Sequence, residues 1–197
     1  MERKTYSALL ALVLVCGCAT PRVVVPPSDE LKSARYSEAL AEIRRVGRNG
    51  DWIVIRGYHA TDNLVAVATN TPWTHAAVLD LGKGEVIEAE AQGVHGSPLE
   101  QLVGRAHRLL LVRPSWANDS TSTEAVVRAR SLVGKGYDFL GLAGIDDPER
   151  YYCSELAIAV YRPYIPKNER IPRPVAPSQL HYWGRILYDS GDPSALP

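Results

Sequence analysis

The sequence predicts an α+β domain in which a small antiparallel sheet packs against a helix that begins near Cys153. Two runs typical of strands, residues 75–81 and 85–91, flank the turn Gly82-Lys83-Gly84 and predict a hairpin. An apolar helical run follows Cys153 and ends at Pro163. At 197 residues, 46% of them hydrophobic, the chain is long enough for one domain with a proper core.

Charge excludes some classes of partner. Lys+Arg and Asp+Glu number 22 each, so the formal net charge is zero. A domain that binds nucleic acid, or a polybasic segment that binds a membrane, would carry a basic excess or stripe. We therefore expect no nucleic-acid partner.

The first 17 residues have the pattern of a secretory signal. Arg3 and Lys4 precede an apolar run over residues 6–17, which is shorter than the roughly 20 residues of a membrane-spanning helix. The sequence Val15-Cys16-Gly17-Cys18 resembles a bacterial lipobox, which implies cleavage before Cys18 and lipidation of that cysteine. Residues 18–27 then read as an extended, proline-containing tether, and residues 28–197 as a single domain.

The lipobox resemblance also implies a location. Two or more acyl chains on Cys18 anchor a protein stably, since each buried methylene contributes about 0.8 kcal/mol. Ala19 is similar to the outer-membrane sorting choice of Gram-negative bacteria. We therefore expect a lipoprotein of the outer membrane that faces the periplasm. The alternative is an ordinary signal peptide that is cut nearby.

The remaining elements follow from capping, turn and periodicity signals. Ser28, Asp29 and Glu30 begin a helix that extends to about Arg48. Further elements are expected as follows: a strand at 52–56, a helix at 61–69, a loop at 71–74, a strand at 107–112, a helix at 118–134, the Cys153 helix, a turn at 176–180 and a strand at 186–188.

The hairpin places chemically interesting residues together if its loop has two or four residues. Ala77 then pairs with Glu88 and His75 with Glu90, so His75, Glu88 and Glu90 share one face of the sheet. A three-residue loop would move both glutamates to the other face. The sequence thus allows a pair between His75 and a carboxylate, which would orient the imidazole and raise its basicity.

Cys153 is the only cysteine left in the domain, because Cys16 would leave with the signal and Cys18 would be lipidated. An inert, buried core residue is one interpretation, since free cysteines are among the most buried side chains. The other is a nucleophile. A thiol at a helix N-terminus beside an imidazolium has a pKa below the usual value of about 8.5, and free N–H groups at that helix start can bind an oxyanion.

A family resemblance favours the nucleophile. The chain contains, in order, Thr74-His75-Ala76-Ala77-Val78-Leu79, Val86-Ile87-Glu88-Ala89, Gly93-Val94, Gly136-Tyr137-Asp138 and Tyr151-Tyr152-Cys153-Ser154-Glu155-Leu156. This order resembles the circularly permuted, YiiX-like branch of the NlpC-type papain-like cysteine peptidases, in which the histidine and acidic strands precede the cysteine helix. The lecithin:retinol acyltransferase group is a relative with the same order.

The resemblance implies roles for individual residues. Cys153 matches the nucleophile, His75 the general base and Glu88 the residue that orients the histidine, with Glu90 as the competitor for that third position. Tyr137 and Tyr152 match positions near the substrate cleft. The other histidines match no catalytic position and are expected to be surface or structural residues; they are His59, His95, His107 and His181.

Other chemistries have little support. The chain has no Cys-x-x-Cys or His-Glu-x-x-His spacing and no Gly-rich phosphate loop, so we expect neither a metal nor a cofactor. The expected activity is cleavage of an amide bond in cell-wall peptides through a thioacyl intermediate. An acyltransferase or a lipid deacylase is the alternative within enzymes, and a non-catalytic binding lipoprotein is the alternative outside them.

Overall fold

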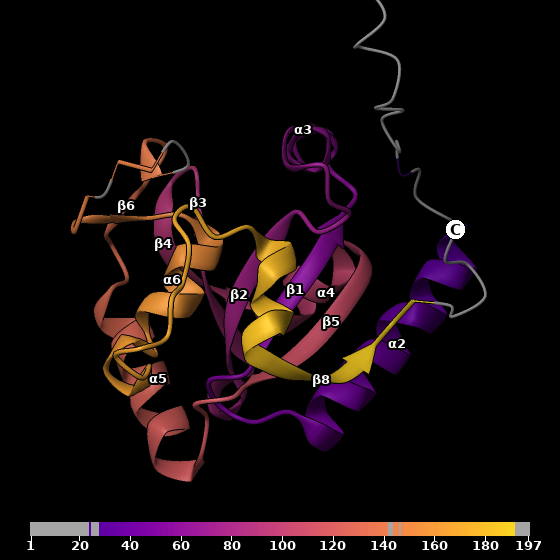
Figure 1. Cartoon of the computed structure of the whole chain (residues 1–197). Helices are drawn as coiled ribbons and strands as arrows, with labels where there is room; N and C mark the ends of the chain where they lie inside the picture. The colour runs from indigo at the N-terminus through magenta and orange to yellow at the C-terminus, as the bar shows by residue number, and fades with distance from the viewer. Residues whose placement is uncertain (1–23, 25–27, 142–143, 146, 192–197) are drawn as a thin grey trace, which may run out of the picture.

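The computed structural model describes residues 24, 28–141, 144–145 and 147–191 (Figure 1). The predicted signal, Cys18 and all of the predicted tether except Val24 lie outside the described residues. Among the helices of the described part, none has the length and apolar character that a membrane span requires.

The centre of the fold is a six-stranded antiparallel sheet with the strand order β4-β3-β2-β1-β5-β8. Its strands are β1 (Trp52–Gly57), β2 (His75–Asp80), β3 (Glu85–Glu90), β4 (Gly93–Pro98), β5 (Ala106–Pro114) and β8 (Gly184–Asp189). The expected α+β fold with an antiparallel sheet is therefore confirmed. A separate pair of short parallel strands, β6 (Gly136–Tyr137) and β7 (Arg150–Tyr151), lies just before the Cys153 helix.

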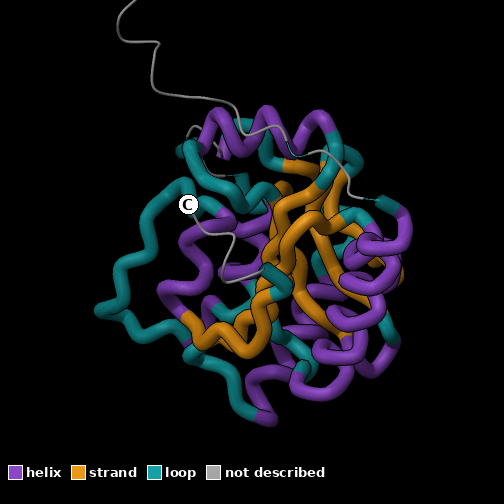
Figure 2. The backbone as a smooth tube through the Cα atoms, turned by 90° about the vertical axis from the view of Figure 1, so that its right-hand side faces the viewer, coloured by secondary structure: helices purple, strands orange, loops and turns teal. Residues whose placement is uncertain are grey.

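Helices cover both faces of the sheet, as Figure 2 shows. Helices α2 (Asp29–Val46) and α4 (Leu99–Gly104) pack on one face, and α5 (Asp119–Ser131) and α6 (Cys153–Ala159) pack on the other. β1 lies in the middle and is buried on both faces: Trp52 and Val54 belong to the core under α5 and α6, whereas Ile53 and Ile55 belong to the core under α2 and α4. This explains its continuous apolar sequence.

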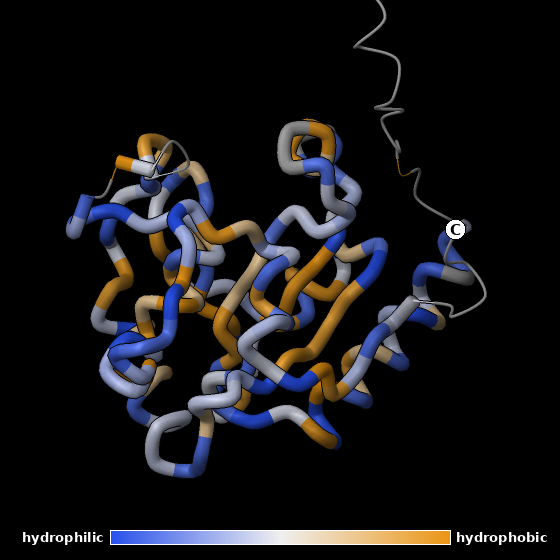
Figure 3. Tube along the Cα trace, viewed as in Figure 1, coloured by the Kyte–Doolittle hydropathy of each residue, from blue (hydrophilic) through white to orange (hydrophobic). Residues whose placement is uncertain are grey.

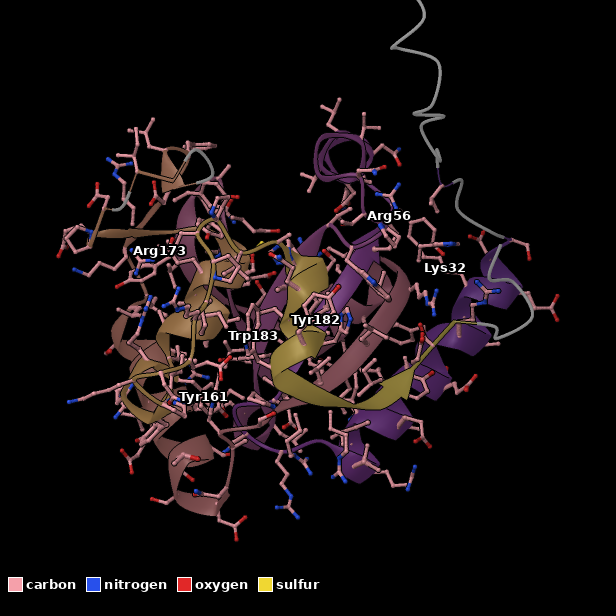
Figure 4. The ribbon with its side chains drawn as sticks, viewed as in Figure 1. Lys32, Arg56, Tyr161, Arg173, Tyr182 and Trp183 are labelled. Atoms are coloured by element: carbon pink, nitrogen blue, oxygen red, sulfur yellow. The ribbon has the colours of Figure 1, made fainter. Side chains whose placement is uncertain are left out.

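The core between α6 and the sheet is closed by aromatic side chains. Trp52 meets Tyr161 edge to face, with ring centroids 5.9 Å apart. The Tyr161 hydroxyl, on the residue labelled in Figure 4, donates to the Gly50 carbonyl over 3.1 Å. The chain just after α6 is thereby joined to the turn that precedes β1.

The hairpin of β2 and β3 has the register expected for an even loop. Ala77 pairs with Glu88 and Asp80 with Glu85, which leaves a four-residue connection. Leu81–Lys83 forms a 3-10 turn, and Gly84 completes it with a φ of 66°, a value that glycine adopts without strain. The prediction that His75 and Glu88 share a face is therefore confirmed.

β4 and α4 were not predicted from the sequence, and neither was the short pair β6 and β7. β4 contains Gly93, Gly96 and Pro98 and lacks the β-branched pattern of a strand. Such a sequence is tolerated because β4 is an edge strand, which pairs only with β3. α4 has six residues, too few for a clear helical periodicity.

Helix α3 (Ala60–Thr69) confirms the helix expected at 61–69 and lies at the end of the sheet where β1 ends and β2 begins (Figure 1). Asp62 holds its first turn, because the carboxylate accepts hydrogen bonds from the His59 amide (3.0 Å) and the Thr74 hydroxyl (2.6 Å). Thr74 immediately precedes His75, so α3 is fixed to the start of β2.

Candidate active site

Cys153 is the first residue of α6, and both of its neighbours are attached to the same segment of chain. The Ser154 hydroxyl donates to the Val175 carbonyl over 2.7 Å, and the Val175 amide donates to the Tyr152 hydroxyl over 2.9 Å. All four residues are buried, with Cys153 itself 8% exposed. These bonds fix the start of α6 and hence the direction of the thiol.

His75 lies at the start of β2, the strand against which α6 packs. Its Nε2 is 2.6 Å from Oε2 of Glu88, and its ring also forms a hydrogen bond with the Cys153 side chain. An ionised carboxylate can only accept a hydrogen bond, so Nε2 carries the proton and Nδ1 is the nitrogen available to the thiol. The structure therefore brings Cys153, His75 and Glu88 into one hydrogen-bonded series.

Glu88 is held from several sides. Its side chain is 2% exposed, and Arg105 donates to the same Oε2 over 2.5 Å. The Ser97 side chain of β4 also forms a hydrogen bond with the carboxylate. Burial alone would raise the pKa of Glu88, but the bond to His75 and the charges of His75 and Arg105 outweigh it and lower the pKa to about 2.

Arg105 is a site residue that sequence reasoning missed. Besides Glu88, its guanidinium forms an ion pair with Glu90, so it joins the two carboxylates that compete for the third position. It follows α4 directly, and neither α4 nor β4 was predicted. Its position in the sequence therefore carries no signal of its place in the site.

The thiol and the imidazole stabilise each other in their charged forms. Burial opposes a charge on either group, yet the hydrogen bonds to Cys153 and Glu88 raise the pKa of His75 to about 10. Burial likewise opposes the thiolate, but the bond to His75, its charge and the backbone amides of Ala76 and Ser154 lower the pKa of Cys153. The arrangement favours a thiolate–imidazolium pair near neutral pH.

A cavity of about 340 Å³ opens onto this pair. Cys153 and His75 lie on its wall together with Val65 of α3 and with Tyr137 and Phe139 from the segment after α5. Burial and the nearby Cys153 charge raise the pKa of Tyr137, so its hydroxyl stays protonated and can donate a hydrogen bond.

The two tyrosines expected near the cleft have different positions. Tyr137 lines the cavity, as expected, whereas Tyr152 is not among the residues on its wall. Tyr152 is 3% exposed and its hydroxyl accepts the Val175 amide, so the structure gives it a structural role behind the thiol. The sequence could not separate them, because both are aromatic residues close to Cys153.

His59 and His95 also lie near the site, although no catalytic role was expected for them. His59 lines the cavity at the start of α3. His95 pairs with Glu88 across β3 and β4, and its Nε2 is 3.4 Å from Oε2 of Glu90. His95 thus supports the two carboxylates from the side away from His75.

The side chains of His75, Glu88 and Glu90 offer ligand atoms within 4.8 Å of one another, a spacing that a metal ion could use. The guanidinium of Arg105, however, already binds both carboxylates and supplies the positive charge between them. A metal ion would have to displace Arg105 and compete with the bond between His75 and Glu88. The residues as arranged do not fit a resident metal.

Comparisons with known proteins agree with this fold. Residues 48–172 match the family described as permuted papain-like amidase enzyme, YaeF/YiiX, C92 family, a stretch of more than half the chain that includes Cys153, His75 and Glu88. Among curated proteins, none matches the chain significantly.

The fold is shared with a solved structure. The crystal structure of the metalloprotein YiiX from Escherichia coli O157:H7 aligns with a TM-score of 0.50 and 23% sequence identity. The alignment covers 60% of this chain and 66% of that chain, so the chain spans slightly less than two thirds of that protein's length.

Proposed function

The chain belongs to the permuted papain-like amidase family, and from that premise we propose that Cys153, His75 and Glu88 act as its catalytic triad. Membership makes the protein a hydrolase of the cysteine peptidase/amidase type. The observation that carries the assignment is the buried series in which His75 bonds both Cys153 and Glu88 at the wall of the cavity.

In the first half of the reaction, the Cys153 thiolate attacks the carbonyl carbon of the substrate and forms a tetrahedral oxyanion. The His75 imidazolium then donates its proton to the leaving amine as the C–N bond breaks. The products of this half are a free amine and a thioacyl bond to Cys153. Glu88 stabilises the imidazolium and keeps the ring oriented.

In the second half, His75 takes a proton from water as the water oxygen attacks the thioacyl carbon. The C–S bond breaks, the acid leaves, and the thiolate–imidazolium pair is restored. Arg105 contributes indirectly, since its charge keeps Glu88 ionised throughout the cycle. Tyr137 is the cavity residue that we assign to substrate binding.

The first candidate substrate is a peptide amide of the cell wall. This choice follows from the proposed location: a signal over residues 1–17, a lipid-anchored Cys18 and a tether that holds the domain to the outer membrane on its periplasmic side. The membrane would then be a partner through the anchor, and cell-wall material the nearest source of amides.

The second candidate is an acyl lipid, cleaved by a deacylase or passed on by an acyltransferase. The observation that favours it is the exposed apolar side chains beside the cavity, Leu64 and Val67 on one side and Phe139 and Leu140 on the other. Water and a second acceptor compete for the same thioacyl bond, so both outcomes are compatible with the triad.

A metal-dependent reaction is a weaker candidate. YiiX, the protein of similar fold, is a metalloprotein. In this chain Arg105 occupies the position between Glu88 and Glu90 that a cation would need. We therefore propose a thiol mechanism that involves no metal.

Alkylation of the thiol tests the proposed triad. An activated Cys153 should react with iodoacetamide at about pH 6, because the thiolate is the reactive form, and His75→Ala should slow this reaction strongly. If the pH dependence of the alkylation rate in the unchanged protein instead gives a thiol pKa of about 8.5, the proposed triad is wrong.

Substrate trials distinguish the candidates. The protein is incubated with cell-wall peptides and, separately, with phospholipids, and the mass of Cys153 is examined for a thioacyl adduct. An adduct from only one class assigns the substrate. No adduct from either, with an activated thiol, would favour a binding lipoprotein without turnover.

A further inference from the structure

Helix α3 has an outer surface unlike that of a helix that faces water. Leu64 is 70% exposed and Val67 is 47% exposed. The only ionisable residue of α3 is Asp62, whose carboxylate is turned inward to Thr74 and to the amide of His59. Surface helices normally carry polar or charged residues on this side, so Leu64 and Val67 make the exposed surface of α3 suited to an apolar partner.

A second apolar segment lies across the cavity. Phe139, Leu140 and Ile145 follow β6 and are each about three-fifths exposed. Together with Leu64 and Val67 they are five of the nine exposed large hydrophobic side chains found among the described residues. Figure 3 shows hydrophobic positions both in α3 and in the loop after β6.

These two segments, which we call the apolar rims, border the proposed active site. Val65 of α3 and Phe139 both line the cavity, and Cys153 and His75 line the same cavity. A flat apolar surface that contacted both rims would therefore cover the mouth of the cavity.

The chain that precedes the domain approaches at the same place. The amide of Val24 is 3.5 Å from Oδ1 of Asn63 in α3, and the same oxygen accepts a bond from Arg56, labelled beside α3 in Figure 4. Cys18 lies six residues before Val24, and six extended residues span at most about 20 Å. An acylated Cys18 would thus hold α3 within about 20 Å of the bilayer.

We propose that the apolar rims dock on the phospholipid bilayer that holds the acylated Cys18, with the mouth of the cavity turned toward the lipid. This inference rests on the proposed lipidation of Cys18. An acyl anchor combined with a second apolar contact binds a membrane far more stably than either alone. A cleft in this position takes its substrate from the bilayer, which favours the acyl lipid over a soluble cell-wall peptide.

Depth-dependent quenching tests the docking. The full, acylated chain carrying Cys153→Ala is given one new thiol, by Leu64→Cys or Phe139→Cys on the rims or by Val127→Cys as a control, and is labelled with bimane. Val127 is 64% exposed on α5 and matches Leu64 in exposure. The proteins are placed in phosphatidylcholine vesicles with brominated acyl chains.

Loss of most fluorescence at positions 64 and 139, with little loss at 127, is the expected result. Equal quenching at all three positions, or none at the rims, would overturn the docking. A blue shift of bimane emission at positions 64 and 139, but not at 127, in the absence of vesicles would assign the rims to a second copy of the chain and would also overturn the docking.

The same preparation separates this proposal from the proposed function. The intact mass reports whether Cys18 is acylated, and iodoacetamide alkylation of the unchanged protein reports whether Cys153 is activated. If the protein is acylated and its thiol is activated but the labels on the rims are not quenched, the docking is rejected and the proposed triad is not. A chain without the acyl mass rejects the anchor and the docking together, and leaves the triad to its own test.

Discussion

At the scale of single residues, Glu88 is the side chain whose hydrogen bonds and ion pair bear most directly on the proposed chemistry. It accepts from His75 and Arg105 on one oxygen, whereas Glu90, two residues later on the same face, is bound to Arg105. Pairing across the hairpin would favour Glu90 for the third position, since it lies opposite His75. The side chain of His75 turns instead to Glu88, the position that the family motif indicates.

Glu88→Gln should lower kcat/KM by at least about 100-fold, because a neutral amide cannot stabilise the imidazolium. Glu90→Gln should have a much smaller effect, since Glu90 is bound to Arg105 and Gln92 whereas His75 is bound to Glu88. Steady-state kinetics on the substrate that forms the adduct provide the measurement. A larger loss in Glu90→Gln would transfer the orienting role to Glu90.

The lowered pKa of Glu88 also predicts how stability depends on pH. The folded protein favours the carboxylate, with a pKa of about 2 against an ordinary value of 4.5. The stabilisation is therefore complete above the ordinary value and is lost as the pH falls toward about 2. The difference in Tm between the unchanged protein and Glu88→Gln should shrink between pH 5 and pH 3; a constant difference would contradict the assignment.

At the scale of elements, the position of α6 depends on Val175, a residue in an irregular segment far along the chain. Its carbonyl and amide bind the side chains on either side of Cys153. A helix of seven residues has little stability of its own, so these bonds and the packing of Leu156 keep its first turn in place.

Ser154→Ala should lower the free energy of unfolding by about 1–3 kcal/mol, because it leaves the buried Val175 carbonyl without its donor. Ser131→Ala is the matched control: its hydroxyl also donates to a backbone carbonyl, that of Arg128, but at an exposed site. Ser131→Ala should change the free energy of unfolding by no more than about 0.5 kcal/mol. Urea denaturation compares the two, and equal losses would argue against a structural role for Ser154.

The sequence predicts the elements whose signals are local. The hairpin, α2, α3 and α5 carry turn, capping or periodicity signals, and the structure confirms them. β4 and α4 lack such signals, because an edge strand tolerates glycine and proline and a six-residue helix shows no periodicity. Arg105 was missed for the same reason, and its contacts depend on tertiary structure alone.

At the scale of the whole molecule, the sheet is enclosed between two layers of helices, and the site lies at one end of it. α5 and α6 share a core with β1, β2 and β3, so α6 and the strands of His75 and Glu88 are packed against each other directly. Stability of this core and geometry of the site are therefore linked.

Leu156→Ala should lower the free energy of unfolding by about 2–5 kcal/mol, because Leu156 is fully buried between α6 and the sheet and its truncation leaves a cavity. Leu64→Ala, at an exposed position of α3, should change stability by no more than about 0.5 kcal/mol. Denaturant unfolding monitored by tryptophan fluorescence measures both. Similar losses of unfolding free energy in the two variants would show that the stability of α6 does not depend on this core.

The permuted order of the chain also leads us to expect a particular time at which the Cys153 thiol becomes reactive. His75 and Glu88 meet through a hairpin with a four-residue loop, and we expect this contact to form early because its loop is short. Cys153 joins them only when α6 docks across a long stretch of chain. Until then its thiol has the ordinary pKa of about 8.5 and is mostly protonated at neutral pH. We therefore expect a newly made chain to be less open to oxidation at Cys153 until α6 docks on the sheet.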